Sequence, residues 1–447
     1  MASATPEEGS SGARKRDHTP PARVRQPEPA NGSKNGTNGA SQHSIHEKEF
    51  GGPVGVVFII LASHVLVVCM AASLSGFTPA LFAPTLKSFI WFFTYHALQY
   101  TLARTMPGIT LTGPSGLQYL CNGYASFYMT LAVGICAHVV GIFDLTDLAR
   151  EFPSFLTTAI IIANIYALML HGYYAQAEQR FSVYDFFMGV EVHPRIGIVD
   201  IKMTAETRLS WNLLMLVSLG SYVETTRRLG TWCTPAAFLV LAHYLYANAC
   251  AKGEHFIPYT WDITTEKFGW MLCWWNVVGV PLVYCYQSLF LATYAWDGLV
   301  LPSAVKVYYA AITLALLLSY WVWDESNYQK CYFKMEQRNE VVRRHLFPTF
   351  RHLKDPKYIK CDAGVLLTDG WYSHARKMAY TADASMALLW GLACGFGSFL
   401  PYLYFFFFLA MIMHRCSRDE ARCRRKYGAA WDRYLKAVPW RFVPYVY

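Results

Sequence analysis

The stretch FLPYLYFFFFLAMIM (residues 399–413) is followed without a break by HRCSRDEARCRRKYG (residues 414–428). The first part carries no charged side chain and predicts a helix within the hydrocarbon of a bilayer. The second part is dense in Arg and Lys. A basic segment directly after an apolar helix indicates the cytosolic surface of a membrane, where anionic lipid attracts positive charge. This order predicts a helical membrane protein with a basic cytosolic C-terminal segment.

The composition of the whole chain indicates the same class. Hydrophobic residues make up 54% of the 447 residues and charged residues only 15%, whereas soluble domains carry about a quarter charged residues. Apolar runs recur and predict an all-α, polytopic membrane protein with about ten transmembrane helices. The runs lie near residues 54–74, 86–102, 117–142, 155–174, 211–223, 236–249, 270–292, 307–322, 384–396 and 399–413. Only Gly397 and Ser398 separate the last two, which predicts a tight helical hairpin.

The distribution of charge predicts domains and topology. Residues 1–49 are rich in Ser, Gly, Asn, Pro and charge, without apolar periodicity, which predicts a disordered tail. Residues 50–447 are expected to form the membrane domain, with the cofactor and substrate half at about residues 250–447. Basic residues cluster in the tail, in the connection 324–383 and after residue 414. With ten spans all three regions lie in the cytosol, and so do both termini.

A cofactor would have to be bound without the usual motifs. The 12 cysteines form no CxxC pair and no His/Cys cluster, so no metal is expected. No Gly-x-Gly-x-x-Gly follows a strand, so a nicotinamide cofactor would be held by charged and aromatic side chains. Lys330 and Lys334 share a helix face, and with Arg415, Arg424 and Arg425 they could neutralise the phosphates of NADPH. A solvated or lipid-facing basic loop is the alternative, and nucleic acid is not an expected partner.

The aromatic segment 255–287 is a candidate for binding a flat apolar substrate. It contains acids at or near membrane depth, where ionisable groups are costly and usually functional. A packed core or an interfacial aromatic belt is the alternative for its tryptophans. The residues singled out in this segment are Trp261, Asp262, Glu266, Trp274 and Asn276.

The residue order from His414 onward resembles the C-terminal signature of the sterol reductase family. The matching elements are His-Arg-x-x-Arg-Asp and Cys-x-x-Lys-Tyr-Gly. The segments Trp-Asp-x-x-Asn-x-Gln-Lys (residues 323–330) and Asp-Gly-Trp-Tyr (residues 369–372) are similar to two further family motifs. The resemblance covers nearly all of residues 54–447. It implies a multi-pass enzyme of the endoplasmic reticulum membrane that reduces a sterol double bond with NADPH.

The resemblance also implies roles for individual residues. Asp419 and Tyr427 are expected to form the catalytic neighbourhood. The residues implied to bind NADPH are Lys330, Lys334, Leu367, Tyr372, Tyr380, Arg415, Asp419, Cys423, Arg424, Arg425, Lys426, Tyr427 and Tyr434. The chain departs from the family at Lys334, where Arg is more usual, and at His193, where the family typically has Asn. Expected partners are the sterol, membrane lipid and other enzymes of sterol biosynthesis.

The most specific prediction concerns which double bond of the sterol is reduced. Members of the family reduce ring bonds at C14 or C7, or the side-chain methylene at C24(28). The segment around Trp270 and Asn276 is most similar to the fungal side-chain reductases of ergosterol biosynthesis, and ring reductases tend to carry an acid near Asn276. An unactivated alkene must be protonated before hydride can add to it, and the sequence leaves the proton donor open. The alternatives are a ring reductase, a sterol-binding protein without catalysis, and a membrane methyltransferase that binds S-adenosylmethionine.

Overall fold

The computed structural model describes residues 49–294, 303–342, 346–350 and 352–446. The predicted disordered tail, residues 1–49, lies outside the described residues except for Glu49. Helices dominate the described chain, and its few strands form short antiparallel hairpins. The all-α prediction is therefore confirmed at the level of fold class.

The elements follow one another in two halves of the chain. The first half contains α1 (Gly52–Ser75), α2 (Pro79–Phe82), α3 (Leu86–Thr105), β1 (Ile109–Thr112), β2 (Gln118–Cys121), α4 (Gly123–Val139), α5 (Asp147–Arg150), α6 (Phe152–Glu178), α7 (Val183–Met188), β3 (Arg195–Ile196), β4 (Val199–Asp200) and α8 (Ile201–Thr204). The second half contains α9 (Ser210–Leu229), α10 (Thr234–Lys252), α11 (Trp261–Thr264), α12 (Trp270–Trp274), α13 (Tyr286–Tyr294), α14 (Ser303–Glu336), β5 (Tyr358–Cys361), β6 (Gly364–Leu367), α15 (Trp371–His374), α16 (Met378–Leu392), α17 (Leu403–Tyr427) and α18 (Ala429–Ala437).

Several helices are suited to a bilayer. Those long and apolar enough to cross a membrane, among the described residues, are Glu49–Ser75, Phe152–Gln176, Trp270–Tyr294, Val305–Glu336 and Leu400–Tyr427. Each of the ten apolar runs overlaps a helix, but five spans meet the criteria of length and composition. The total of ten membrane crossings stays a prediction.

Two predicted boundaries differ from the structure. The run 117–142 begins as a strand, because Gln118–Cys121 pairs antiparallel with Ile109–Thr112 before α4 starts at Gly123. The connection between α16 and α17 is longer than the predicted Gly397-Ser398 hairpin. Gly395 adopts a left-handed φ of 74° just after α16, and Pro401 stands in the short 3₁₀ turn that precedes α17. Both residues are typical of helix ends, so the two helices are joined by residues 393–402.

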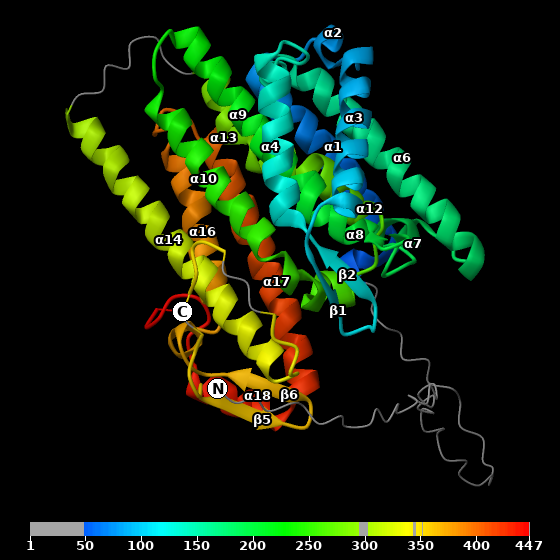
Figure 1. The fold of residues 1–447 in the computed structure, drawn as a ribbon, viewed down its shortest axis with the longest axis vertical. Helices are drawn as coiled ribbons and strands as arrows, with labels where there is room; N and C mark the ends of the chain where they lie inside the picture. The colour runs from blue at the N-terminus through cyan, green and yellow to red at the C-terminus, as the bar shows by residue number, and fades with distance from the viewer. Residues whose placement is uncertain (1–48, 295–302, 343–345, 351, 447) are drawn as a thin grey trace, which may run out of the picture. The chain divides into compact units, whose positions relative to one another are not determined.

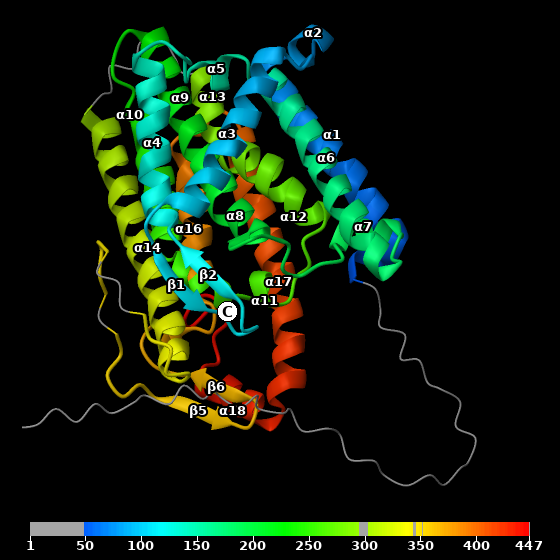
Figure 2. The same cartoon turned by 45° about the vertical axis from the view of Figure 1, so that its right-hand side comes forward.

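The C-terminal elements gather at one end of the helices. Helix α14 packs against α16, and α16 packs against α17 (Figure 1). Helix α18 packs against α17 and β5, and β5, β6 and α18 lie beside the ends of α14 and α17 in both views (Figure 2). This end carries the basic segment that starts at Arg415.

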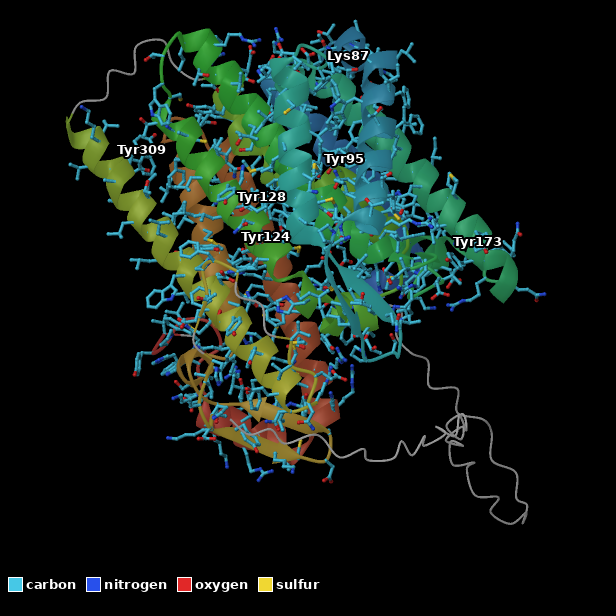
Figure 3. All side chains as sticks on the ribbon, viewed as in Figure 1. Lys87, Tyr95, Tyr124, Tyr128, Tyr173 and Tyr309 are labelled. Carbon is cyan, nitrogen blue, oxygen red and sulfur yellow. The ribbon has the colours of Figure 1, made fainter. Side chains whose placement is uncertain are left out.

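Apolar side chains also cover much of the outer surface. Val54 on α1, Met169 on α6 and Val307 on α14 are largely exposed, which fits contact with lipid. Tyr173 projects outward from α6, whereas Lys87 marks the end of the helices opposite α18 (Figure 3). The apolar faces and the charged ends are those expected of helices in a bilayer.

Two π-helical segments interrupt the interior helices. Ala205–Leu209 links α8 to α9, and Trp275–Tyr284 links α12 towards α13. Pro281 lies inside the second segment, where its missing N–H prevents regular α-helical bonding. The two segments pack against each other. Such wide turns redirect side chains and often occur at functional sites.

Candidate functional site

Helix α17 carries the charged residues of the C-terminal signature on two faces. Arg415, Arg418 and Arg422 recur at helical spacing and form one stripe. Asp419 and Cys423 form a second stripe on the adjacent face. The first stripe contacts the segment around α11, and the second contacts the start of α16.

The first stripe joins residues predicted for the cofactor to residues predicted for the substrate. Arg415 Nη2 lies 2.7 Å from Asp262 Oδ2, and Arg418 Nη2 lies 3.5 Å from Glu266 Oε1. Trp261 Nε1 donates a hydrogen bond of 2.5 Å to Glu266 Oε1. The structure therefore brings Trp261, Asp262 and Glu266 to α17, although more than a hundred residues separate them in the chain.

A cation–π contact extends this stripe. The guanidinium carbon of Arg422 lies 3.4 Å from the centroid of the Trp261 ring. Such a contact is favourable where the ring is partly shielded from water. Arg415 has its carboxylate partner on α11, so in this structure it does not lie free beside Lys330 and Lys334 as the predicted phosphate site required.

The second stripe centres on an ion pair. Lys377 Nζ donates a hydrogen bond to the carboxylate of Asp419, and Asp419 Oδ1 lies 3.9 Å from Cys423 Sγ. Lys377 Nζ also lies 5.9 Å from the centroid of the Tyr380 ring. Burial opposes the charge of Lys377, but the charge and hydrogen bond of Asp419, together with the nearby Tyr380, raise the Lys377 pKa above its ordinary value. Asp419 is therefore held as a carboxylate next to Lys377.

Lys330 and Lys334 supply positive charge without a carboxylate partner. Both side chains are exposed on α14. Lys330 Nζ lies 5.9 Å from the centroid of the Tyr372 ring. Neither lysine has a carboxylate within 4.0 Å among the residues that the structure describes. Two adjacent cations without carboxylate partners are suited to bind an anionic ligand such as a dinucleotide phosphate.

Buried apolar and aromatic side chains border this charge. Leu367 and Tyr372 pack with Phe333 in one cluster, and Tyr434 packs with Trp431 in a second. Burial, together with the nearby Tyr372, raises the pKa of Tyr434 to about 12. The structure thus places the predicted residues Leu367, Tyr372 and Tyr434 around the end of α14.

The last residues of the signature point elsewhere. Arg424 Nη1 lies 3.7 Å from Asp432 Oδ1 on the surface. Lys426 Nζ lies 5.0 Å from the centroid of the Tyr427 ring, which stacks on Trp431 at 6.5 Å. Arg425 is exposed. These residues lie at the end of α17 beside α18, two helical turns beyond Asp419.

The two deepest residues predicted for the substrate lie apart from the α17 contacts. The Trp274 ring stacks on Trp270 at 5.0 Å and lies 4.1 Å from the His64 ring. Asn276 is 3% exposed, and its Nδ2 has no hydrogen-bond partner within the described residues. Trp274 therefore faces α1, and Asn276 presents an unused donor within the π-helical segment.

Sequence reasoning missed three ionisable residues. Lys377 lies outside the residues predicted for the site, and only its partner on a distant helix reveals it. Glu206 has a buried Oε1 without a hydrogen-bond partner in the described chain. Asp383 is 8% exposed and accepts a hydrogen bond from Tyr246. The available signal was a charge close to the start of a predicted apolar run, five residues before it at residue 206 and directly before it at residue 383.

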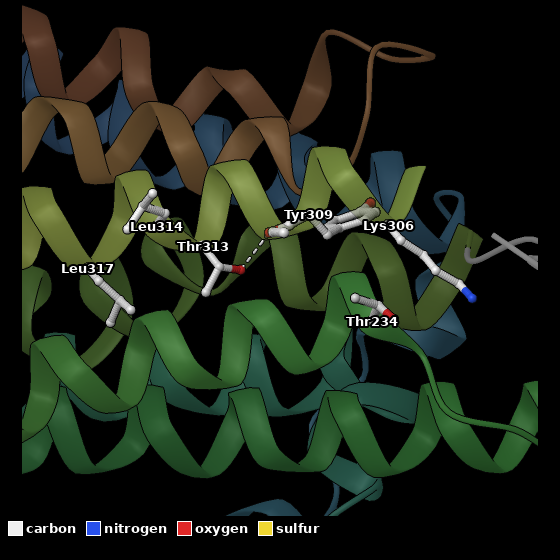
Figure 4. Close-up of a pocket in the computed structure, with 7 residues that line it drawn as sticks. Thr234, Lys306, Tyr309, Thr313, Leu314 and Leu317 are labelled. Carbon is white, nitrogen blue, oxygen red and sulfur yellow. Dashed lines mark hydrogen bonds between the residues drawn. The ribbon is translucent and has the colours of Figure 1, made fainter. Parts of the chain in front are cut away.

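A surface groove lies at the other end of α14. Its volume is about 560 Å³, and it separates the start of α14 from α10 (Figure 4). The lining residues are Thr234, Lys306, Tyr309, Ala310, Thr313, Leu314 and Leu317. None of the residues predicted to bind cofactor or substrate lines it, so this groove is distinct from the candidate site.

Comparison with known proteins covers most of the chain. A sequence profile of the ergosterol biosynthesis ERG4/ERG24 family matches residues 67–447. The Delta(24(24(1)))-sterol reductase erg4A of Aspergillus fumigatus is 36% identical over 91% of this chain and 94% of its own length. The Delta(24(24(1)))-sterol reductase of Gibberella zeae is 39% identical over 81% of this chain, which spans 63% of that relative. The Delta(14)-sterol reductase of Methylotuvimicrobium alcaliphilum is 35% identical over 80% of this chain and 82% of its length.

Proposed function

The chain belongs to the ergosterol biosynthesis ERG4/ERG24 family of sterol reductases, and on that premise we propose that it reduces the C24(28) double bond of an ergostane-type sterol with NADPH. The observation that carries this choice of bond is the match to the Aspergillus fumigatus relative over 94% of its length. The name of that relative refers to the double bond between C24 and the attached methylene carbon. Asn276 supports the choice, because ring reductases tend to carry an acid near that position.

The chemistry of the basic residues supports NADPH as the reductant. Lys330 and Lys334 are exposed cations without a carboxylate partner among the described residues, so they can neutralise the phosphates of a dinucleotide. When it is bound, NADPH supplies a hydride to the sterol. Leu367, Tyr372 and Tyr434 offer aromatic and apolar surface beside these cations.

The ion pair with Lys377 limits the role that Asp419 can have in the reaction. A carboxylate paired with Lys377 cannot donate a proton, so we assign Asp419 the task of orienting Lys377, which lies beside the Tyr380 ring. Tyr427 lies two turns further along α17, on the same face, beside Trp431. In this proposal the catalytic neighbourhood extends along α17 from Asp419 to Tyr427.

The ion pairs between residues 262–266 and α17 connect the two halves of the proposed site. Asp262 and Glu266 neutralise Arg415 and Arg418 on the helix that carries Asp419. Binding of an anionic cofactor would compete with Asp262 for Arg415, because both are anions. Sterol binding beside Trp261 would then be coupled to cofactor binding through Arg415.

The cellular setting follows from the helices and the family. We propose an endoplasmic reticulum membrane location with both termini in the cytosol, where NADPH is available. Sterol and membrane lipid are the proposed partners, together with other enzymes of sterol biosynthesis. The apolar outer surfaces of α1, α6 and α14 support contact with lipid.

Sterol analysis of cells that lack this protein tests the reaction. We expect sterols with an intact C24(28) methylene to accumulate, and expression of the full chain to remove them. The Delta(14) relative at 35% identity makes reduction at C14 the second candidate. Accumulation of sterols unsaturated at C14, with the side chain reduced, would select that candidate instead.

A further inference from the structure

The proton donor must be an acid that no cation already holds in its ionised form. Several buried or half-buried carboxylates of the described chain are paired with cations. The pairs are Asp419 with Lys377, Asp262 with Arg415, Asp324 with Lys252, and Glu254 with Arg208. A carboxylate in such a pair is stabilised in its ionised form and is a poor proton donor.

Asp383 is a buried acid of a different kind. It is 8% exposed on α16, and it has no ion pair within the part of the chain that the structure describes. Its Oδ2 accepts a hydrogen bond of 3.3 Å from the Tyr246 hydroxyl. An ionised carboxylate without a cation is unfavourable in such surroundings, so the carboxyl group is favoured in its neutral, hydrogen-bonded form.

Aromatic rings surround the Tyr246–Asp383 pair. Tyr246 stacks on Trp323 with ring centroids 4.7 Å apart, and it lies 5.9 Å from Trp390. Trp390 in turn stacks on Tyr404 at 5.3 Å, and Tyr404 lies 4.5 Å from Tyr284. The faces of electron-rich rings attract positive charge. This set of residues combines an acid with groups that stabilise a carbocation.

The pair also lies next to the proposed cofactor residues. Trp323 precedes Lys330 by seven residues on α14, about 10 Å along the helix. Asp383 follows Lys377 by six residues, about 9 Å along α16. Because α14 and α16 pack together, both residues lie about two turns further from the basic end than the two lysines. A dinucleotide that enters between these helices would extend towards Asp383.

We propose that Asp383 is the catalytic acid that protonates the sterol double bond, and this rests on the proposed function. The O–H bond of the Asp383 carboxyl breaks, and its proton forms a C–H bond at C28 with the electron pair of the alkene. C24 becomes a tertiary cation facing the aromatic rings, and it then gains the hydride that NADPH supplies. The sterol is reduced, NADPH is oxidised, and the Asp383 carboxylate regains a proton from water. Tyr246 positions the carboxyl group through its hydrogen bond.

Asp383→Asn tests this role with the least change of shape. Asn can still accept the hydrogen bond from Tyr246 but has no acidic proton. We expect kcat to fall at least about a hundredfold, the usual scale for loss of acid catalysis, with sterol and NADPH affinities within about threefold of wild type. Asp383→Glu keeps the acid and should restore part of kcat. Asp383→Asn with more than a third of wild-type kcat would overturn the proposal.

Infrared spectroscopy of the NADPH-free protein gives a second readout. With ¹³C-labelled aspartate carboxyls, wild type should show a protonated-carboxyl band that shifts in D₂O and is absent from Asp383→Asn. The label excludes Glu206, whose carboxyl also lacks an ion pair in the described chain. Asp324→Asn is the matched control, because Asp324 is buried on the facing helix but paired with Lys252, so its loss should leave the band in place. Should Asp383→Asn not fold, absence of the band from wild type overturns the proposal.

The two hypotheses can fail separately. If wild type reduces a C14 alkene and leaves C24(28) intact, the proposed bond is wrong, and the same variants are then assayed on the C14 alkene. If wild type reduces C24(28) and Asp383→Asn does so equally well, the bond is right and the acid is wrong.

Discussion

Lys377 at the start of α16 donates a hydrogen bond to the carboxylate of Asp419 on α17. This contact joins two helices that meet at the proposed cofactor site. It also distinguishes two roles that the sequence alone did not assign to separate residues, which are orienting groups at the site and donating the proton. Asp419 is fixed as a negative charge beside Lys377, so it can orient that side chain and balance its charge. The proton must then come from a different acid, one that is not paired with a cation.

Asp419→Asn should lower the rate about a hundredfold, the usual scale for loss of one positioned electrostatic group at a reacting centre. NADPH affinity should not fall with it, because neutralising the carboxylate leaves Lys377 free to attract the anionic cofactor, and sterol affinity should change little. Titration of NADPH and sterol against the purified variant separates these effects. Asp432→Asn is a suitable control, since its contact with Arg424 is exposed and should contribute little. Equal losses in both variants would contradict a specific role for Asp419.

Lys330→Ala should raise the KM for NADPH at least about tenfold, because a charge-assisted contact to phosphate is lost. The preference for NADPH over NADH should shrink, and sterol binding should persist. Lys306→Ala is the matched control, because Lys306 lies on the same helix at its opposite end (Figure 4). Unchanged kinetics with both nicotinamides would rule out a phosphate contact for Lys330.

Lys334→Arg should tighten NADPH binding by about threefold, because a guanidinium group can bind phosphate through two hydrogen bonds where an ammonium offers a point charge. Lys334 is exposed on the same face as Lys330, so the larger side chain has room. Binding of NADPH measured by calorimetry is the direct test. Weaker binding in the variant would show that the native lysine is fitted to its ligand.

The helices were predictable from the sequence, whereas the pairing of charges was not. Apolar runs such as residues 155–174 coincide with helices because their lengths and composition leave few alternatives. Asp262 and Arg415 lie 153 residues apart, and nothing local indicates that they meet. Lys377 and Asp419 lie 42 residues apart on separate helices. Such contacts depend on how the helices pack, which one sequence does not specify.

Local structure explains the remaining differences. Residues 118–121 are apolar enough to continue a helix, but their pairing with β1 makes them a strand. The π-helical segments depend on tertiary contacts as well as on Pro281, so no propensity rule predicts them. Family resemblance predicted Lys330, Tyr372 and Tyr380 as neighbours of one site, and the structure places Lys330 beside Tyr372.

Glu206 makes stability depend on pH in an unusual direction. Burial, reinforced by the negative charge of Asp262, raises the pKa of Glu206 from 4.5 to about 8. Between these pH values the folded protein keeps a proton that the unfolded chain releases, so this group makes the folded state less stable as pH rises from about 4.5 to about 8. Glu206→Gln cannot ionise and should abolish that decline. We expect the variant and wild type to melt at similar temperatures at pH 5, and the variant to melt at the higher temperature at pH 8.

Glu224→Gln, on the same helical stretch beside Arg150, is a control that should leave the decline in place. Parallel curves for wild type and Glu206→Gln would show that Glu206 ionises at the same pH in both states.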